Sequence, residues 1–350
     1  MAYTDIDDPS KYFQTALYTG NGGTQAITNT GNSDLQPNWI WTKVRSEAGS
    51  HRLVDTVRGL AKPLSSNGDD AEADETNYSA FNSDGFSLVN ESLNENNRTY
   101  VAWQWKAGTA VSGNTSGSGT AKAYSGSVNT DAGFSMITYI GNGTGGHAIP
   151  HHLGVAPKMI IAKNRVNGIS WPVYHVGVGA TKFFYLDTGN AAGESTVWND
   201  TTPTSSVFTM NDTDNNNNAE ANIAYCFAEK QGYSKIGSYT GNGNANGTFV
   251  YTGFKPAWIL VKNSVNNSTP WHLRDSARAK AAPDATPPVV EANTNQSEAD
   301  VGNWNTSFLS NGFKQRDTNA YANGAGIKYI YMAFAENPFV TSKGTPATAF

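Results

Sequence analysis

The sequence has little charge, almost no cysteine and no long apolar run. Of its 350 residues only 15% are charged, and 24 basic against 29 acidic residues give a net charge of −5. An acidic chain without a basic cluster is a poor nucleic-acid binder, because phosphate contacts need Lys and Arg. The single cysteine, Cys226, excludes an internal disulfide and a thiolate metal cluster. No apolar run approaches the ~20 residues of a membrane-spanning helix, so we expect no membrane insertion.

Helical heptads are missing as well, and we expect no leader sequence. Ala-, Leu- and Lys-rich heptads do not occur, which excludes a coiled coil. Residues 1–8 contain neither a basic nor an apolar segment, so we expect no signal peptide. The sequence is rich instead in turn residues, with 35 Gly, 38 Asn and 14 Pro, and in aromatic residues, with 9 Trp, 16 Tyr and 15 Phe. This composition favours a soluble all-β protein made in the cytoplasm.

Three motifs each occur three times, in the same order along the chain. The first is Tyr-x-Gly-Asn-Gly, at residues 18–22, 139–143 and 239–243. The second is Pro followed by a short apolar run that ends in Lys, at residues 37–43, 157–163 and 256–262. The third is an apolar segment, at residues 100–105, 223–229 and 331–336. Asn-Gly is typical of a hairpin turn, and a period near 100 residues indicates tandem domains rather than a solenoid.

The repeats divide the chain into three units. Short apolar runs bounded by Pro and polar residues are typical of buried strands, and several of them per unit indicate a β-sandwich. We predict an all-β fold of three tandem antiparallel β-sandwich repeats, jelly-roll-like in form and joined end to end. The predicted segments are an N-terminal arm at 1–14, repeats at 15–107, 131–234 and 235–342, a flexible Gly/Ser/Thr-rich linker at 108–130, and a C-terminal tail at 343–350.

Two segments could bind a metal ion. His147, His151 and His152 are ligands that Zn²⁺ or Ni²⁺ accepts, but no acidic fourth ligand lies near and the other units have no matching His. The Asn/Asp-rich loop at 211–220 alternates oxygen ligands as a Ca²⁺ loop does, yet it lacks the Gly and Glu that such loops need. We therefore predict no metal site and no cofactor, and metal binding at these two places stays an open alternative.

No catalytic constellation stands out. The acidic run at 69–75 could supply a pair of carboxylates for glycoside hydrolysis, but its polar surroundings favour a solvated loop. A Gly-x-Ser-x-Gly elbow between a strand and a helix is not found. Cys226 lies between Tyr225 and Phe227, which favours a small buried side chain over a nucleophile. We predict a protein that is not an enzyme, with a polysaccharide depolymerase as the least favoured alternative.

Tryptophan recurs at matched positions of the units, which indicates core packing within each unit. Trp39 and Trp41 should share one strand face, because side chains alternate along a strand. Trp171 and Trp271 follow the second motif by eight or nine residues and lie near predicted loops. Aromatic rings at such places can stack on sugar rings, so these two residues are our candidate glycan contacts, although core packing is favoured for them too.

The residues of these motifs resemble those of a repeated domain in virion structural proteins of marine tailed bacteriophages such as cyanophages. The resemblance covers nearly the whole chain and rests on residues 36–43, 51–59, 100–108, 154–164, 197–201 and 237–243. It implies a tail-fibre-like or capsid-decorating protein of the virion surface, made in the host cytoplasm, whose partners are other virion proteins. It supplies no catalytic residues.

We therefore expect a non-enzymatic virion protein that assembles through protein–protein contacts. Residues 1–14 fall outside the repeat, and their apolar side chains Tyr3, Ile6, Tyr12 and Phe13 form the predicted docking arm. Fibre proteins are usually trimers, so the resemblance implies a homo-oligomer and favours a homotrimer. The alternative function is an adhesin that binds host surface polysaccharide. Tail or capsid location and the host are left open.

Overall fold

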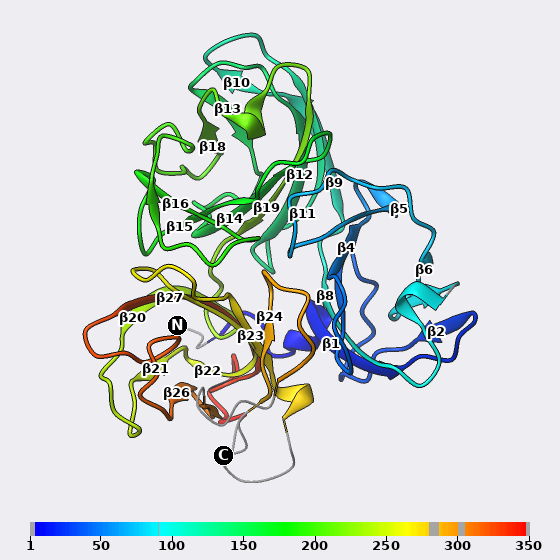
Figure 1. The fold of residues 1–350 in the computed structure, drawn as a ribbon, viewed down its shortest axis with the longest axis vertical. Helices are drawn as coiled ribbons and strands as arrows, with labels where there is room; N and C mark the ends of the chain where they lie inside the picture. Colours follow the sequence, from blue (N-terminus) through cyan, green and yellow to red (C-terminus); the bar gives the residue numbers. More distant parts are fainter. Residues whose placement is uncertain (1–3, 90, 280–286, 300–304, 348–350) are drawn as a thin grey trace.

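The computed structural model describes residues 4–89, 91–279, 287–299 and 305–347 and consists mainly of antiparallel strands (Figure 1). The helices within these residues are four short 3-10 helices: η1 (Pro9–Lys11), η2 (Glu91–Leu93), η3 (Asp214–Asn216) and η4 (Ser276–Arg278). The all-β prediction is confirmed.

Unit 1, residues 13–105, places a five-stranded sheet against a three-stranded sheet. The larger sheet has the order β1-β8-β3-β4-β5 and the smaller one the order β2-β7-β6. The strands are β1 (Phe13–Thr19), β2 (Gln25–Ile27), β3 (Trp39–Val44), β4 (Arg52–Asp55), β5 (Gly59–Leu64), β6 (Tyr78–Phe81), β7 (Phe86–Leu88) and β8 (Thr99–Trp105).

Unit 3, residues 234–338, repeats this arrangement. Its larger sheet has the order β20-β27-β22-β23-β24 and its smaller sheet the order β21-β26-β25. The strands are β20 (Ser234–Thr240), β21 (Phe249–Tyr251), β22 (Phe254–Asn263), β23 (His272–Asp275), β24 (Val290–Glu291), β25 (Thr306–Leu309), β26 (Gly312–Gln315) and β27 (Lys328–Pro338).

Unit 2, residues 109–227, contains the same five strands within a sheet of eight. That sheet has the order β17-β16-β15-β14-β19-β12-β11-β9, and the smaller sheet is β10-β13-β18. The strands are β9 (Thr109–Asn114), β10 (Ser116–Gly117), β11 (Ala123–Asn129), β12 (Phe134–Ile140), β13 (His147–Pro150), β14 (Met159–Asn164), β15 (Pro172–His175), β16 (Lys182–Tyr185), β17 (Gly193–Glu194), β18 (Val207–Met210) and β19 (Ala221–Phe227).

The prediction of a flexible linker at 108–130 is wrong, because strands β9, β10 and β11 lie in this segment. β11 pairs with β12 on one side and with β9 on the other, so the segment extends the large sheet of unit 2. β11 buries four of its seven residues, whereas the small polar residues of β9, the outermost strand, suit a position of little burial, since most of its side chains are exposed. Low bulk therefore reflects the edge of a sheet here and not a flexible connection.

Each Gly-Asn-Gly segment carries the chain from the large sheet to the small sheet of its unit, so the predicted hairpin is not formed. The last Gly of each motif has a positive φ, 74° at Gly22, 68° at Gly143 and 63° at Gly243. The side chain of a buried Asn forms hydrogen bonds with the Asn of each turn. In unit 1, Nδ2 of Asn94 donates to Oδ1 of Asn21 at 2.7 Å, and the backbone NH of Asn21 donates to Oδ1 of Asn94 at 3.0 Å. Asn216 and Asn323 make the matching contacts.

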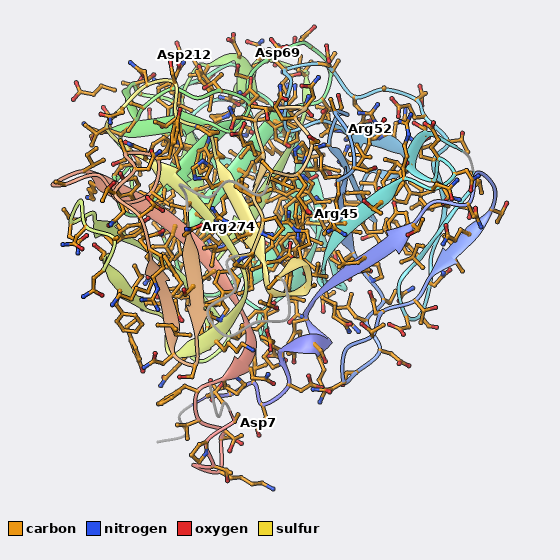
Figure 2. The ribbon with its side chains drawn as sticks, turned by 60° about the horizontal axis from the view of Figure 1, so that its bottom comes forward. Asp7, Arg45, Arg52, Asp69, Asp212 and Arg274 are labelled. Atoms are coloured by element: carbon orange, nitrogen blue, oxygen red, sulfur yellow. The ribbon has the colours of Figure 1, made fainter. Side chains whose placement is uncertain are left out.

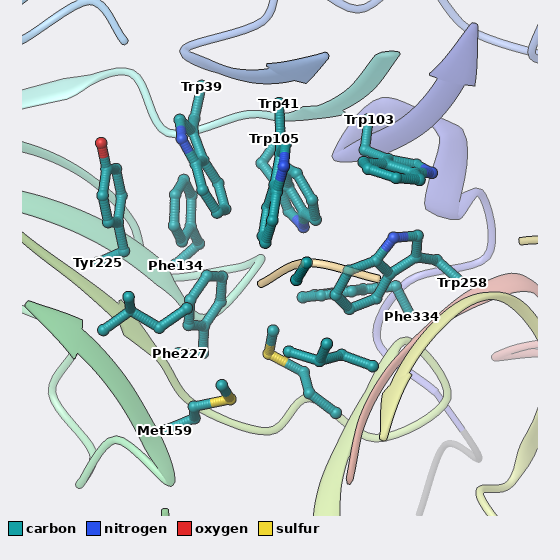
Figure 3. Close-up of a cluster of buried hydrophobic side chains, with 14 of the residues drawn as sticks. Trp39, Trp41, Trp103, Trp105, Phe134, Met159, Tyr225, Phe227, Trp258 and Phe334 are labelled. Atoms are coloured by element: carbon teal, nitrogen blue, oxygen red, sulfur yellow. The ribbon is translucent and has the colours of Figure 1, made fainter. Parts of the chain in front are cut away.

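The molecule has two kinds of hydrophobic core. One lies inside each sandwich, between its two sheets, and in unit 1 it contains Ile40 and Tyr100 of the large sheet with Phe86 of the small sheet. The other is a common core that joins the outer faces of the three large sheets (Figure 3). Strand alternation separates the two cores, since Ile40 faces its own sandwich while Trp39 and Trp41 face the common core.

Aromatic rings from all three units meet in the common core. Trp105 of unit 1, Phe227 of unit 2 and Phe334 of unit 3 occupy the same register position in their sheets. The ring centroid of Phe334 lies 5.8 Å from that of Trp105 and 6.1 Å from that of Phe227. The units therefore surround a pseudo-threefold axis (Figure 1), and the expectations of units joined end to end and of tryptophans packed within each unit are corrected.

Candidate functional site

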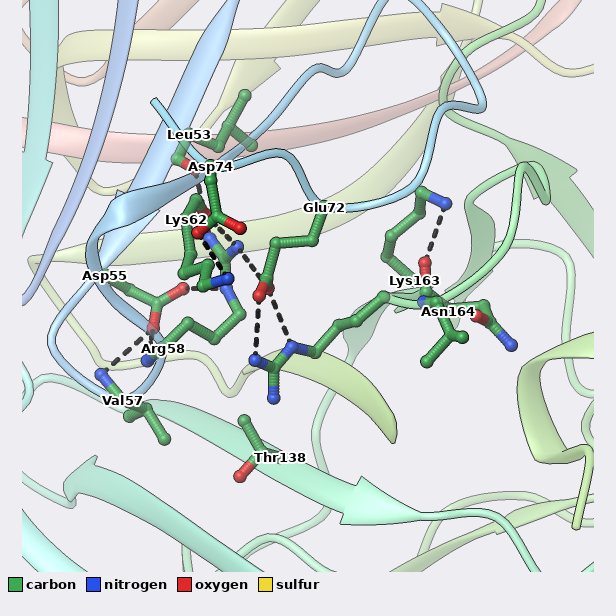
Figure 4. A network of polar contacts seen from close by, with 12 residues as sticks. Leu53, Asp55, Val57, Arg58, Lys62, Glu72, Asp74, Thr138, Lys163 and Asn164 are labelled. Carbon is green, nitrogen blue, oxygen red and sulfur yellow. Dashed lines mark hydrogen bonds and ion pairs between the residues drawn. The ribbon is translucent and has the colours of Figure 1, made fainter. Parts of the chain in front are cut away.

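The interface between units 1 and 2 contains a buried chain of ion pairs (Figure 4). Asp55 ends β4, and its Oδ2 accepts from Nε of Arg58 at 2.7 Å, with both side chains fully buried. Arg58 also contacts Glu72 at 3.2 Å, and Glu72 accepts from Nε of Arg165 in unit 2 at 2.7 Å. The hydroxyl of Tyr225 in unit 2 donates to Asp55 at 2.8 Å. Each charge has an opposite charge as its partner, which is the condition for burying it.

The interface between units 3 and 1 repeats this chain. Asp275 and Arg278 pair at 2.6 Å and are both fully buried, and Arg278 contacts Glu298 at 3.0 Å. Glu298 in turn accepts from Nε of Arg45 in unit 1 at 2.8 Å. The indole NH of Trp103, also in unit 1, donates to Asp275 at 2.9 Å. An equivalent set of four charged residues, Asp, Arg, Glu and Arg, thus lies at two of the three interfaces.

The interface between units 2 and 3 has uncharged groups at the matched positions. His175 pairs with β14 where Asp55 pairs with β3, and Val178 stands where the arginine would be. Nε2 of His175 donates to the backbone carbonyl of Tyr331 at 3.1 Å. Burial lowers the pKa of His175 to about 4, so the ring is neutral at pH 7.

The lysine that ends the second motif is fully buried in every unit. Lys163 donates to the carbonyl of Asp69 in unit 1 at 3.0 Å, and Lys262 donates to that of Gly189 in unit 2 at 2.9 Å. Burial lowers the pKa of Lys43 and Lys163 to about 8 and that of Lys262 to about 7. The ammonium groups of Lys163 and Lys262 therefore join neighbouring units through backbone carbonyls.

The predicted glycan contacts are buried at the interfaces. Trp171 is 0% and Trp271 is 1% exposed, so neither ring can stack on a sugar and this prediction is wrong. Their indole NH groups donate to backbone carbonyls of the preceding unit, at 3.0 and 2.9 Å. His51, the matched residue of unit 1, makes the corresponding contact to a carbonyl of unit 3 at 3.0 Å. These three contacts join unit 2 to unit 1, unit 3 to unit 2 and unit 1 to unit 3, so the three units form a closed ring.

The predicted docking arm is part of the folded body. Ile6 and Phe13 are buried in the common core, where the ring of Phe13 stacks on that of Phe334 at 5.4 Å. Tyr12 is partly buried and packs edge-on against another aromatic ring at 5.8 Å. The prediction is corrected for these three residues, because their apolar surface is already covered by the chain itself. Tyr3 lies outside the described residues.

The two terminal segments are tied to each other at one end of the molecule. Figure 2 shows Asp7 at the opposite end of the view from Asp69. The carboxylate of Asp7 accepts from the backbone NH and the hydroxyl of Ser342, at 2.6 and 2.5 Å. These hydrogen bonds lower the pKa of Asp7. The described part of the predicted arm, residues 4–14, therefore contacts Ser342 as well as the common core.

Within the acidic run at 69–75, Glu72 belongs to the first interface, whereas Asp74 and Glu75 pair inside unit 1. Glu72 is held between two arginines, as described above. Glu75 pairs with Arg52 at 3.0 Å, and Asp74 pairs with Lys62 at 2.5 Å. The expectation of a solvated loop is wrong for Glu72, whose side chain is 8% exposed.

The histidine cluster does not converge. Both ring nitrogens of His147 are used, one by Oδ1 of Asn216 at 2.6 Å and the other by a threonine hydroxyl at 2.7 Å. His151 bonds to a backbone carbonyl at 3.1 Å, and His152 bonds to a tyrosine hydroxyl at 2.8 Å. Within the described ranges no three His, Cys, Asp or Glu side chains are grouped to hold a metal ion. Cys226 is buried, as expected, and burial raises its pKa.

A family model described as a domain of unknown function, DUF7483, matches residues 8–338. The chain belongs to this family. No curated protein and no solved structure matches it. Within the part of the chain that the structure describes, no helix is long and apolar enough to cross a bilayer. Because the match spans all three units, the DUF7483 domain corresponds to the closed ring and not to a single repeat.

The sequence interpretation of this DUF7483 domain missed the role of charged residues at the interfaces between units, although it named the acidic run that contains Glu72. One signal was present, since Asp is followed three residues later by Arg at both 55–58 and 275–278, at a similar distance after the second motif. Glu72 and Glu298 lie in segments of different composition and carry no such signal. Their role depends on contacts between units.

Proposed function

We propose that the chain is a non-enzymatic structural protein on the surface of a bacteriophage virion, tail-fibre-like or capsid-decorating, which assembles through protein–protein contacts. The observation that carries the proposal is the position of the motif residues. Segments 36–43 and 100–108, on which the resemblance to virion proteins rests, supply four tryptophans of the common core. The resemblance therefore concerns the residues that join the units, and proteins that share these motifs should share the ring.

The interfaces between the units support a structural role. At two of the three interfaces acidic and basic side chains pair with one another, and both oxygens of Glu72 accept from guanidinium groups, while the buried ammonium groups of Lys163 and Lys262 donate to backbone carbonyls of the neighbouring unit. Groups used in this way hold units in a fixed relation. A body of this kind suits a particle surface, where a protein must keep its shape outside the cell.

The homotrimer stays a prediction. One chain already arranges three copies of the same fold about an axis, so a single chain can occupy a threefold position on a particle without two further copies. Light scattering on the purified protein separates the two arrangements. A homotrimer gives three times the chain mass of 37.4 kDa, and a monomer gives 37.4 kDa.

Labelled particles test the proposal. Val155 is 47% exposed in a loop of unit 2, so a short peptide tag inserted there should leave both cores intact. Phage particles that carry the tagged chain are purified and imaged with an antibody against the tag. We expect a fixed number of copies at one place on the tail or capsid. A chain that is abundant in the infected cell but absent from purified particles would overturn the proposal.

A further inference from the structure

Unit 3 exposes two aromatic side chains on one strand. Phe249 and Tyr251 lie on the same face of β21 and are 43% and 51% exposed, while Val250 between them is buried. They are the aromatic members of the exposed large hydrophobic residues within the described part of the chain. The matched strands β2 and β13 of the other units carry no Phe, Tyr or Trp. The pair is therefore specific to unit 3 and does not follow from the repeat.

A surface pocket of about 370 Å³ opens beside Tyr251, at the junction of units 2 and 3. Apart from this ring its lining is polar and includes Glu229, Ser234, Lys235 and Thr252. Phe249 does not line it. One aromatic face among polar and charged groups is the chemistry that a polyhydroxylated ring needs, since its CH face packs on the aromatic ring while its hydroxyls form hydrogen bonds.

The ring of Tyr251 lies beside a glycine of its own chain, Gly253. It lies against the backbone at Gly253, where an added Cβ would be 3.7 to 3.8 Å from the tyrosine ring and hydroxyl. Gly253 has a positive φ of 86°, which favours glycine at this place. The chain therefore turns beside the ring of Tyr251, and Tyr251 and Gly253 both line the pocket.

The charge beside the pocket is positive. The carboxylate of Glu229 contacts the ammonium groups of both Lys158 and Lys235, so two cations face one anion. The contact of Lys235 is long, at 3.5 Å, and its side chain is 42% exposed. Oε1 of Glu229 is used by the backbone NH of Ile236 at 2.8 Å. Lys235 can thus turn toward a ligand while Lys158 keeps Glu229 paired.

We propose that this pocket binds an acidic saccharide, whose sugar ring stacks on Tyr251 and whose carboxylate pairs with Lys235. A single surplus positive charge matches the one negative charge of a uronate or sialic acid residue better than the doubly charged phosphate of a nucleotide. Gln231, which lines the pocket and is exposed, offers its side-chain amide to the sugar hydroxyls, whereas the hydroxyls of Ser234 and Thr252 are buried and bonded within the chain. The inference goes beyond the proposed function, because it assigns a ligand to the purified chain and holds wherever the protein sits on a particle.

Calorimetric titration of the full chain tests the proposal. The probes are trisaccharides of galacturonate, glucuronate and guluronate together with sialyllactose, and each acid is compared with its neutral methyl ester. We expect at least one acid to bind at least about tenfold tighter than its ester, a difference of about 1.4 kcal/mol. No binding by any of these acids, equal binding of acid and ester, or tighter binding of a nucleoside monophosphate would overturn the proposal.

Three variants identify the site. Tyr251→Ala and Lys235→Gln should each weaken binding of the acid about tenfold, and Lys235→Gln should leave the ester unaffected. Phe249→Ala is the matched control, since it removes the neighbouring exposed ring outside the pocket, and it should bind as the unchanged chain does. Circular dichroism confirms that the variants fold. Loss of binding in Phe249→Ala, or none in Tyr251→Ala, would place the ligand elsewhere.

Discussion

At the scale of single residues, Trp105 shows how much one side chain contributes to the common core. Its ring lies 4.4 Å from Trp39, 5.6 Å from Trp258 and 5.8 Å from Phe334. Trp105→Ala should lower the free energy of unfolding by about 3–5 kcal/mol, because it leaves a cavity in the common core between units 1 and 3.

Trp105→Phe is the control for this prediction. Phe occupies the matched position in units 2 and 3, and the indole NH of Trp105 has no hydrogen-bond partner among the described residues. The loss should therefore be clearly smaller than for Ala. Urea titration followed by circular dichroism measures both variants, and equal losses would contradict the account.

Substitution of Glu72 tests how much the buried ion pairs contribute to the free energy of unfolding. Glu72→Gln leaves Arg58 and Arg165 without part of their counter-charge at a buried place, so we expect a loss of about 3 kcal/mol in the free energy of unfolding. Glu194→Gln is a matched control, because Glu194 pairs with Lys182 at 3.6 Å and is 83% exposed. It should cost under ~0.5 kcal/mol. Similar effects in urea titrations of the two variants would argue against a structural role of the chain of ion pairs.

Buried histidines predict a loss of stability in mild acid. Burial lowers the pKa of His151 and His175 to about 4, whereas the unfolded chain titrates near 6.5. Between these values the unfolded chain binds protons that the folded chain does not, so the free energy of unfolding falls as the pH falls from about 6.5 toward 4. Urea titrations at about pH 7, 6 and 5 measure the slope above the range of most carboxyl groups. His175→Asn should flatten it, and a slope of zero would contradict the prediction.

At the scale of elements, hydrogen exchange can show whether the segment 109–129 forms paired strands or a free linker. β11 is paired on both sides, so the amide protons of residues 124–128 should exchange slowly with solvent, while β9 at the sheet edge exchanges faster. Hydrogen exchange followed by mass spectrometry measures both strands. Fast exchange throughout the segment, as in a free linker, would be the contrary result.

Strand positions could be predicted from the sequence, but the packing of their faces could not. The apolar runs at 37–43 and 256–262 contain most of β3 and part of β22, because Pro and Lys bound a short buried segment. Alternation places Trp39 and Trp41 on one face. Every residue of β3 is buried, however, so no polar face marks the outside of the sheet. The pattern therefore cannot tell which face meets its own sandwich and which meets the other units.

At the scale of the whole molecule, the contacts that close the ring join distant parts of the chain. Arg45 and Glu298 are 253 residues apart, and His51 contacts a carbonyl 240 residues away. No local pattern relates such residues, which is why the repeat was visible in the sequence while the ring and the ion pairs between units were not. The candidate glycan contacts failed for the same reason, since Trp171 and Trp271 lie next to loops in the sequence but beneath a neighbouring unit in the fold.

Three repeats that form one body around a common core should melt as one, and calorimetry of the full chain measures this. Units that share a core should unfold together, so the account predicts a single transition whose van't Hoff enthalpy equals its calorimetric enthalpy. Three independent sandwiches would give separate transitions, or one broad transition with a van't Hoff enthalpy of about one third of the calorimetric value. That second result would contradict the common core.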